Sequence, residues 1–130
     1  FNSLTKLIKQ KGLADHLSFC GARSDIAKVY KISDIVMNLS SKPEPFGRTI
    51  IEAAACGSHV MGWDRGGVKE SIQSINPDGL VEYGNIGMLA QQIEKVLTSS
   101  PPESIPEQFT KEHLASSTIN VYELALNRAS

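Results

Sequence analysis

The chain has 130 residues, enough for one domain with a hydrophobic core. It is 41% hydrophobic and 21% charged, as is typical of a globular protein, and its net charge of −1 argues against nucleic-acid binding, which usually requires a strongly basic surface. No apolar run approaches the ~20 residues of a membrane-spanning helix, and Cys20 and Cys56 lack a partner motif, which indicates reduced thiols in a cytoplasmic protein.

The first third of the sequence predicts two helices and two strands. The chain opens at Phe1 without a signal peptide or turn cluster and passes at once into a helical pattern, so we interpret it as a piece of a longer protein. A helix is expected from Leu4 to a glycine cap at Gly12. A short apolar strand at Leu17–Cys20, a helix at Asp25–Lys31 and a strand buried on both faces at Asp34–Leu39 are expected to follow.

The remaining sequence continues this alternation of strands and helices. A loop rich in helix-breaking residues, Ser40–Gly47, comes first. The elements predicted after it are a helix at Arg48–Cys56, a strand at His59–Trp63, a helical turn from Gly66 to Ile72, a strand at Gly79–Tyr83, and helices at Ile86–Leu97 and about Lys111–Leu126. Four strands alternating with helices predict an α/β fold, a Rossmann-like parallel sheet with flanking helices.

The segment from Ser41 to Glu70 carries the residues best suited to ligand binding. Gly47 stands where a loop turns into a helix, and a helix start offers free backbone N–H groups to a phosphate. Glu44 lies in the loop before that helix and Glu52 more than one turn inside it. Because a carboxylate accepts hydrogen bonds from sugar hydroxyls well, the two glutamates are expected to hold opposite ends of one ligand.

The predicted topology supports a site at this place. Ligands of open parallel sheets bind at the carboxyl ends of the strands. Three loops rich in small and polar residues, Gly21–Ser24, Ser40–Gly47 and Asp64–Gly67, each follow a predicted strand. We therefore expect these loops to open on one rim of the sheet.

The pattern Glu44-x7-Glu52, written EPFGRTIIEAAACG, resembles the signature of the retaining glycosyltransferase family 4 (glycosyl transferases group 1). The resemblance extends in order over nearly the whole chain, through the matching segments Phe19-Cys20-Gly21, Tyr30, Ser33-Asp34-Ile35, Ser40 and Gly66-Gly67-Val68-Lys69-Glu70. It implies that residues 1–130 form the C-terminal, nucleotide-sugar-binding domain of a GT-B fold. The first two strands of that domain and the acceptor-binding N-terminal domain would then lie outside this chain.

The resemblance also implies a role for each matching residue. Glu44 is expected to contact hydroxyls of the donor sugar as the catalytic glutamate, and Glu52 the ribose hydroxyls. The residues expected to hold the rest of the donor are Phe46, Gly47, Arg48 and Thr49 around the sugar and diphosphate, Gly21 and Arg23 near the base, and Gly66 and Gly67 beside the sugar. From its residue type alone, Arg48 could either bind phosphate or be a solvated residue in the first helical turn. Gly66-Gly67 could either line the cleft or form an ordinary strand-to-helix turn.

The implied parent is an enzyme that transfers a hexose or N-acetylhexosamine, with retention, from a nucleotide sugar (UDP favoured) to a saccharide or lipid-linked acceptor in bacterial surface polysaccharide (O-antigen) synthesis. No metal or other cofactor is expected, and the sequence has no Asp-x-Asp. The Arg and Lys that neutralise the leaving diphosphate in the family belong to the missing units, so the chain alone is expected to be inactive. Lipid-linked acceptors would bring the cytoplasmic parent to the inner face of the membrane.

Three other functions compete with this interpretation. A UDP-N-acetylglucosamine 2-epimerase-like isomerase shares the architecture but shows an acidic pair after the glycine pair, whereas Glu70 is followed by Ser71. A nicotinamide-cofactor domain needs G-x-G-x-x-G after its first strand, which this sequence lacks. The third alternative is a non-catalytic nucleotide-sugar-binding fragment.

The edge of the Asp34–Leu39 strand raises the question of oligomeric state. If the two strands that would lie beside it are missing, its backbone groups need another partner. We expect a homodimer that pairs this edge with a second copy; the alternative is direct closure onto Leu17–Cys20.

Overall fold

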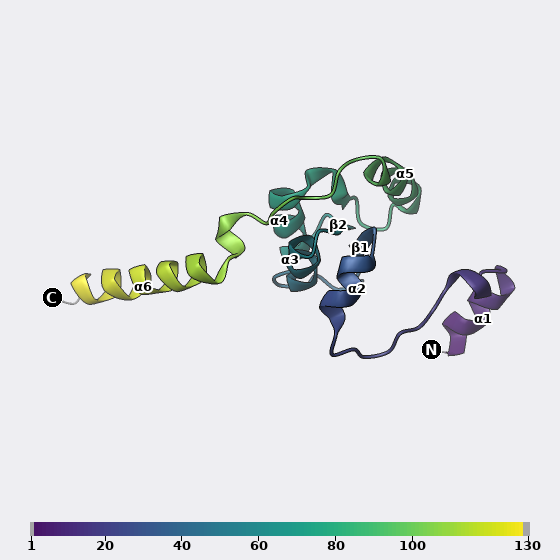
Figure 1. The fold of residues 1–130 in the computed structure, drawn as a ribbon, viewed down its shortest axis with the longest axis horizontal. Helices are drawn as coiled ribbons and strands as arrows, with labels where there is room; N and C mark the ends of the chain where they lie inside the picture. The colour runs from purple at the N-terminus through teal and green to yellow at the C-terminus, as the bar shows by residue number, and fades with distance from the viewer. Residues whose placement is uncertain (1, 129–130) are drawn as a thin grey trace.

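A computed structural model describes residues 2–128. In this part of the chain, a three-stranded parallel sheet has the order β1 (Ile35–Asn38), β2 (His59–Trp63) and β3 (Leu80–Val81), with helices packed around it (Figure 1). The helices are α1 (Asn2–Gln10), α2 (Ile26–Ile32), α3 (Arg48–Ala55), α4 (Gly66–Ile75), α5 (Ile86–Leu97) and α6 (Lys111–Arg128), with short 3-10 turns at Ala14–His16, Pro77–Gly79 and Glu107–Phe109. The predicted α/β class is confirmed.

The core is organised around β2, because this strand pairs on both sides and all five of its residues are buried. Successive side chains of a strand point to opposite faces of the sheet. Val60 accordingly packs with residues of α3 and α4 (Ile50, Ala53, Ala54, Val68 and Ile72) and with Tyr30 of α2. Met61 and Trp63 pack on the other face with Val81 and with Leu89 and Val96 of α5. The two faces of β2 therefore anchor the helices that position the site.

The predicted strand at Leu17–Cys20 is wrong. These residues have no regular secondary structure, and Leu17 and Phe19 are both about half exposed. The local pattern of apolar residues is that of a strand, but a strand exists only where a neighbouring strand completes its ladder. Of the described strands, β1 pairs only with β2, so the sheet has three strands here instead of four.

The prediction that Asp34–Leu39 is buried on both faces is also wrong. Strand β1 lies at the edge of the sheet; Ile35, Val36 and Asn38 are half-buried, and Met37 is 42% exposed. A strand that pairs on one side only keeps contact with solvent along its other side. The apolar run therefore marks a strand correctly but does not give its place in the sheet.

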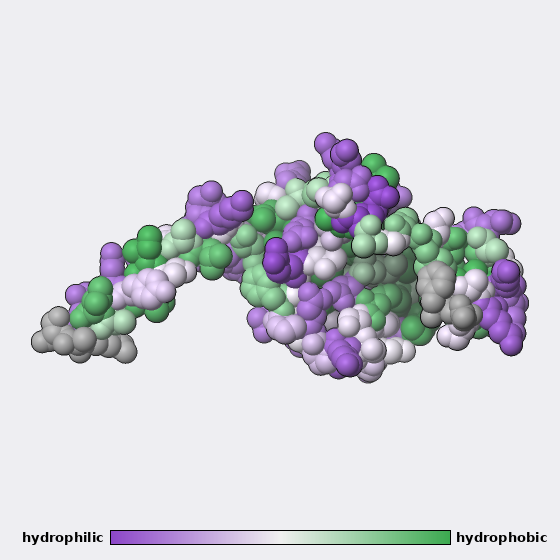
Figure 2. Space-filling view, turned by 90° about the horizontal axis from the view of Figure 1, so that it is seen from below, coloured by the Kyte–Doolittle hydropathy of each residue, from purple (hydrophilic) through white to green (hydrophobic). Residues whose placement is uncertain are grey.

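The two terminal helices lie outside the body that surrounds the sheet. Helix α1 sits beyond an extended segment that leads to α2, and α6 projects from the opposite end as an arm (Figure 1). Apolar side chains cover much of this arm, at the left of Figure 2, and the exposed ones are Leu114, Ile119, Val121, Tyr122, Leu124 and Leu126. The compact part of the molecule therefore runs from α2 to α5.

Candidate nucleotide-sugar site

Glu44 lies in the loop that joins the carboxyl end of β1 to α3. Asn38 is the last residue of β1, and its side-chain amide donates a hydrogen bond to the Glu44 carboxylate. A small hollow of about 10 Å³, little more than the space of one water molecule, adjoins the glutamate. Its lining residues are Asn38, Ser40, Lys42, Glu44, Trp63, Arg65 and Val68. The polar ends of β1 and β2 thus meet at one rim, as the topology predicts.

The loop that carries Glu44 is packed closely against the start of α4. The Gly67 amide donates to the Glu44 carbonyl at 2.8 Å, and the Ser71 hydroxyl donates to the Phe46 carbonyl at 2.9 Å. Gly67 is buried, and a Cβ built on it would lie 2.3 Å from the carbonyl oxygen of Pro45. The second glycine of the pair therefore serves to let α4 approach the loop.

Gly47 makes the turn from this loop into α3. Its backbone is left-handed, with φ of 74°, a conformation that favours glycine. A Cβ there would also crowd the backbone of α4, 3.1 Å from the Val68 Cα. Gly47 is the N-cap residue of α3 and has no side chain that could accept a hydrogen bond. The backbone N–H groups of the first helical turn therefore face the rim with no acceptor from the cap residue.

Glu52 lies more than one turn inside α3, away from the Glu44 hollow. A hollow of about 250 Å³ adjoins it, lined by Phe46, Arg48, Ile51, Glu52, Phe109 and Lys111. Arg48 and Glu52 form an ion pair at 3.4 Å, and their side chains remain 79% and 46% exposed. A pair this exposed contributes at most about 1 kcal/mol, so a ligand can displace Arg48 from Glu52 at little cost.

The N-terminal half of α3 also contacts Tyr30 of α2. Burial, followed by the negative charges of Glu52 and Cys56, raises the pKa of the Tyr30 phenol, and a hydrogen bond with the Thr49 side chain acts in the opposite direction. Thr49 is half-buried and faces this phenol. The Thr49 hydroxyl, which was expected to bind the diphosphate, therefore forms a hydrogen bond with Tyr30 instead.

The raised pKa of Tyr30 predicts a loss of stability at alkaline pH. Because the fold favours the neutral phenol, its contribution is complete below the ordinary pKa of about 10 and is lost as pH rises through the higher folded-state value. The urea midpoint of the wild type should fall between about pH 9 and 11 more steeply than that of Tyr30→Phe. Tyr122→Phe, on the exposed face of α6, should behave like the wild type; equal slopes for the wild type and Tyr30→Phe would contradict the assignment.

Gly21 and Arg23 lie apart from the two hollows described above. They belong to the extended segment before α2, and neither lines the hollow beside Glu44 or the one beside Glu52. Arg23 forms an ion pair with Asp25 at 2.8 Å. The structure therefore brings together Glu44, Phe46, Gly47, Arg48, Glu52 and the glycine pair, but leaves the expected base-binding residues at a distance from them.

Four further residues of the rim were not expected from the sequence. Asn38 and Ser71 hold the Glu44 loop through the hydrogen bonds described above. Lys42 and Arg65 line the Glu44 hollow, and the Arg65 guanidinium lies 4.1 Å from the centre of the Tyr83 ring. Trp63 is a core residue that also lines this hollow.

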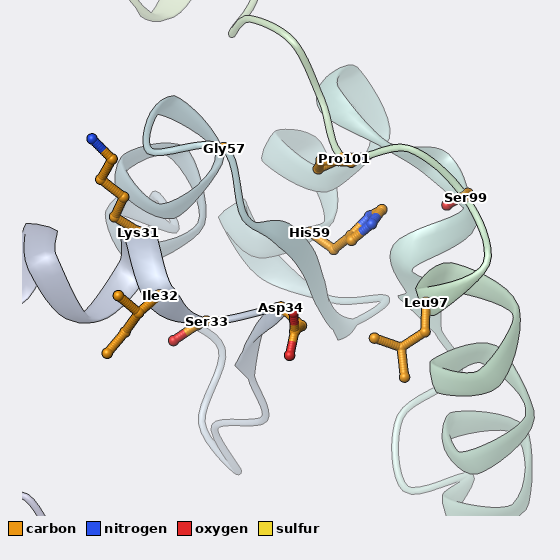
Figure 3. A pocket seen from close by; sticks show the side chains of 9 residues that line it. All are labelled: Lys31, Ile32, Ser33, Asp34, Gly57, His59, Leu97, Ser99 and Pro101. Carbon is orange, nitrogen blue, oxygen red and sulfur yellow. The ribbon is translucent and has the colours of Figure 1, made fainter.

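A third hollow, of about 360 Å³, lies at the amino ends of the strands (Figure 3). It is lined by Lys31, Ile32, Ser33, Asp34, Gly57, His59, Leu97, Ser99 and Pro101. The His59 ring extends toward the segment around Pro101, and the Lys31 side chain points away from this segment. The buried Nδ1 atom of His59 has no hydrogen-bond partner among residues 2–128. This hollow is at the opposite end of the sheet from Glu44, since Asp34 and His59 stand at the starts of β1 and β2.

Residues 2–128 offer neither a metal cluster nor a membrane-spanning helix. In this range no cluster of three or more His, Cys, Asp or Glu side chains has the arrangement to hold a metal ion. Over the same residues, no helix combines the length and the apolar character that crossing a membrane requires.

Comparison with known proteins decides the family. Residues 1–113 match glycosyl transferases group 1. The chain belongs to this family. Among curated members, N-acetyl-alpha-D-glucosaminyl L-malate synthase of Bacillus anthracis is 30% identical over 94% of this chain and 34% of its own length. Mannosylfructose-phosphate synthase of Agrobacterium fabrum is 33% identical over 72% of this chain and 19% of its own length.

Solved structures of group 1 relatives have the same architecture. HepE of Anabaena, crystallised in complex with UDP, superposes with a TM-score of 0.67 at 35% identity, over 72% of this chain and 26% of that one. A glycosyltransferase of Rickettsia africae gives 0.66 at 36% identity, over 75% and 26%. The predicted place of the sheet within a GT-B glycosyltransferase is confirmed, and the chain spans about a third or less of the length of these group 1 proteins.

Proposed function

We propose that this chain is the donor-binding part of a retaining glycosyltransferase that moves a hexose or N-acetylhexosamine from a UDP-sugar to a saccharide or lipid-linked acceptor. The supporting observation is the arrangement around Phe46 and Gly47. A left-handed glycine begins α3 at the carboxyl end of β1, with Glu44 in the loop before it and Glu52 beside a separate hollow inside the helix. One extended ligand with hydroxyls at both ends and phosphates between them suits this arrangement.

The relatives add support for the nucleotide. The Anabaena neighbour is crystallised with UDP, so we propose UDP as the nucleotide here. Within this proposal the diphosphate lies over the first turn of α3, the sugar lies toward Glu44, and the ribose lies toward Glu52. We also propose that the transfer needs no divalent metal, because the sequence has no Asp-x-Asp motif.

The proposed acceptor and cellular role rest on the family resemblance. We propose a role in bacterial surface polysaccharide synthesis, in the cytoplasm at the inner face of the membrane, where lipid-linked acceptors are found. The isolated chain is expected to bind donor weakly and to transfer no sugar, because the Arg and Lys that stabilise the leaving diphosphate in the family belong to units that this chain does not contain.

The test is donor screening with the intact protein from which this sequence comes. Incubation with UDP-glucose, UDP-N-acetylglucosamine, and GDP- and ADP-hexoses, each labelled in the sugar, should release label from one UDP-sugar. Product analysis by NMR should show that the anomeric configuration of the donor is retained. Release from none of these donors, or from a GDP-sugar alone, would overturn the proposed donor.

Glu52→Gln should raise the donor KM of the intact enzyme about tenfold or more. The substitution removes the charge from one hydrogen bond to ribose, and such a bond contributes ~1.5–3 kcal/mol. Glu123→Gln, on the exposed surface of α6, is the matched control. An unchanged donor KM in Glu52→Gln, measured in initial-rate assays, would remove Glu52 from the site.

We also propose that the free edge of β1 pairs with a second copy of the chain. The edge is unpaired among the described residues, the alternative closure onto Leu17–Cys20 is not formed, and Met37 and Leu39 expose apolar surface beside it. Light scattering should give a dimer at tens of micromolar, and Met37→Lys should give a monomer because charges on an edge block pairing. Ile32→Lys, an equally apolar exposed position on α2, should remain dimeric; a monomeric wild type would overturn the proposal.

A further inference from the structure

Three hydrogen bonds fix the loop that carries Glu44, and they act on different atoms. Gly67 and Ser71 of α4 hold the carbonyl oxygens of Glu44 and Phe46, at 2.8 and 2.9 Å, and therefore fix the course of the backbone. The third bond, from the Asn38 side-chain amide, reaches the carboxylate itself. Asn38 alone among these partners can set the direction in which the Glu44 carboxylate points.

Asn38 is well placed for this task. It is half-buried, ends β1, and pairs in register with Gly62 of the buried strand β2, so its Cα is held by the sheet. Its side-chain oxygen accepts from the Ser40 amide at 3.3 Å, which orients the amide nitrogen toward Glu44. Both ends of the Asn38 amide are therefore engaged, and the group has one orientation.

We propose that Asn38 is a positioning residue that presents the Glu44 carboxylate to the donor sugar. This inference rests on the proposed role of Glu44 as the sugar-binding glutamate. A neutral amide occupies one lone pair of one carboxylate oxygen and leaves the full negative charge for sugar hydroxyls. An arginine or lysine would bind the same carboxylate as a competing ion pair, and the nearby Arg65 is instead held over Tyr83.

The contact is first tested on the ligand-free chain. In NMR spectra of the 130-residue chain, the side-chain N–H resonances of Asn38 should shift strongly in Glu44→Ala and remain in place in Glu52→Ala. The two substitutions remove the same charge and the same atoms from neighbouring segments. Asn38 resonances that respond equally to both substitutions, or to neither, would overturn the contact.

The consequence for binding is tested on the intact protein by calorimetry with two probes, UDP and whichever of UDP-glucose and UDP-N-acetylglucosamine binds the wild type more tightly. Asn38→Asp removes the donor group and adds a like charge beside Glu44, so affinity for the UDP-sugar should fall about tenfold while affinity for UDP stays within about twofold. Asn38→Leu, which removes the amide without adding charge, should lie between Asn38→Asp and the wild type. Asn127→Asp on the far end of α6 makes the same change in net charge and should have no effect.

A double-mutant cycle separates positioning from a general structural role. In the Glu44→Ala background, Asn38→Asp should produce no further loss of UDP-sugar affinity, because the carboxylate that it positions is gone. An equal loss for UDP and UDP-sugar, or a loss that persists in the Glu44→Ala background, would overturn the proposal. A wild-type protein that binds neither probe would overturn the proposed function, and the ligand-free spectra would still decide whether Asn38 holds Glu44.

Discussion

Gly67→Ala should be among the most damaging single substitutions in the chain, with an expected loss of about 1–3 kcal/mol in the free energy of unfolding. The new Cβ would lie 2.3 Å from the Pro45 carbonyl oxygen and 2.6 Å from the Phe46 Cα, and both are backbone atoms that cannot rotate away. The loop and the start of α4 must separate, which also breaks the bond from the Gly67 amide to the Glu44 carbonyl. UDP-sugar binding by the intact protein should fall together with stability.

Urea titration measures the stability change, and Gly87→Ala is its matched control. Gly87 lies in the first turn of α5, where the nearest atom to a built Cβ is 3.8 Å away. Alanine is a better helix former than glycine by about 1 kcal/mol, so this control should be neutral or more stable than the wild type. Equal urea midpoints for the two variants would show that α4 and the loop can separate at little cost.

Glu44→Ala should reduce sugar transfer by the intact enzyme at least tenfold and leave its affinity for UDP within about twofold. Glu44 lines the hollow at the end of β1, whereas Arg48 and Glu52 of α3 line a separate hollow. Loss of a charge-assisted hydrogen bond to the sugar is worth ~1.5–3 kcal/mol, or roughly ten- to hundredfold. Free UDP has no sugar at this position and should not detect the change.

Initial rates and calorimetry on the same preparations check this split. Glu94→Ala, on the exposed surface of α5, makes the same chemical change away from the rim and should leave transfer and UDP binding unaltered. If UDP affinity collapses together with turnover, Glu44 acts on the nucleotide or on the fold, and the assignment to the sugar is wrong.

The local parts of the fold could be predicted from the sequence. The bounds of α5 and β2 match the prediction residue for residue, because hydrophobic periodicity and flanking glycines act over short distances. The Leu17–Cys20 strand and the full burial of the Asp34–Leu39 strand were wrong for a common reason. Both depend on which other strand lies alongside, and the apolar pattern of a single segment carries no information about its neighbour.

Some residues of the candidate site could be predicted from the sequence and others could not. Glu44, Gly47 and Glu52 could be singled out because their spacing spans one loop-to-helix junction and follows a family pattern. The roles of Asn38 and Ser71 could not, since each is an ordinary polar residue until the fold brings it to a partner 6 or 25 positions away. The sequence does show Asn38 as a polar amide at the end of an apolar strand beside the glutamate loop, but it does not identify Glu44 as its partner.

The sheet has a further consequence for how the chain reaches its native state. Each strand pairs with its immediate successor, and the paired residues of β1 and β2 lie only about two dozen positions apart along the chain. Contacts of such short separation require the closure of small loops, which is rapid and costs little chain entropy. On the ribosome, β1, α3 and β2 are therefore expected to assemble before α5 has emerged, and the loop bearing Glu44 should be among the first parts of the molecule to acquire its shape.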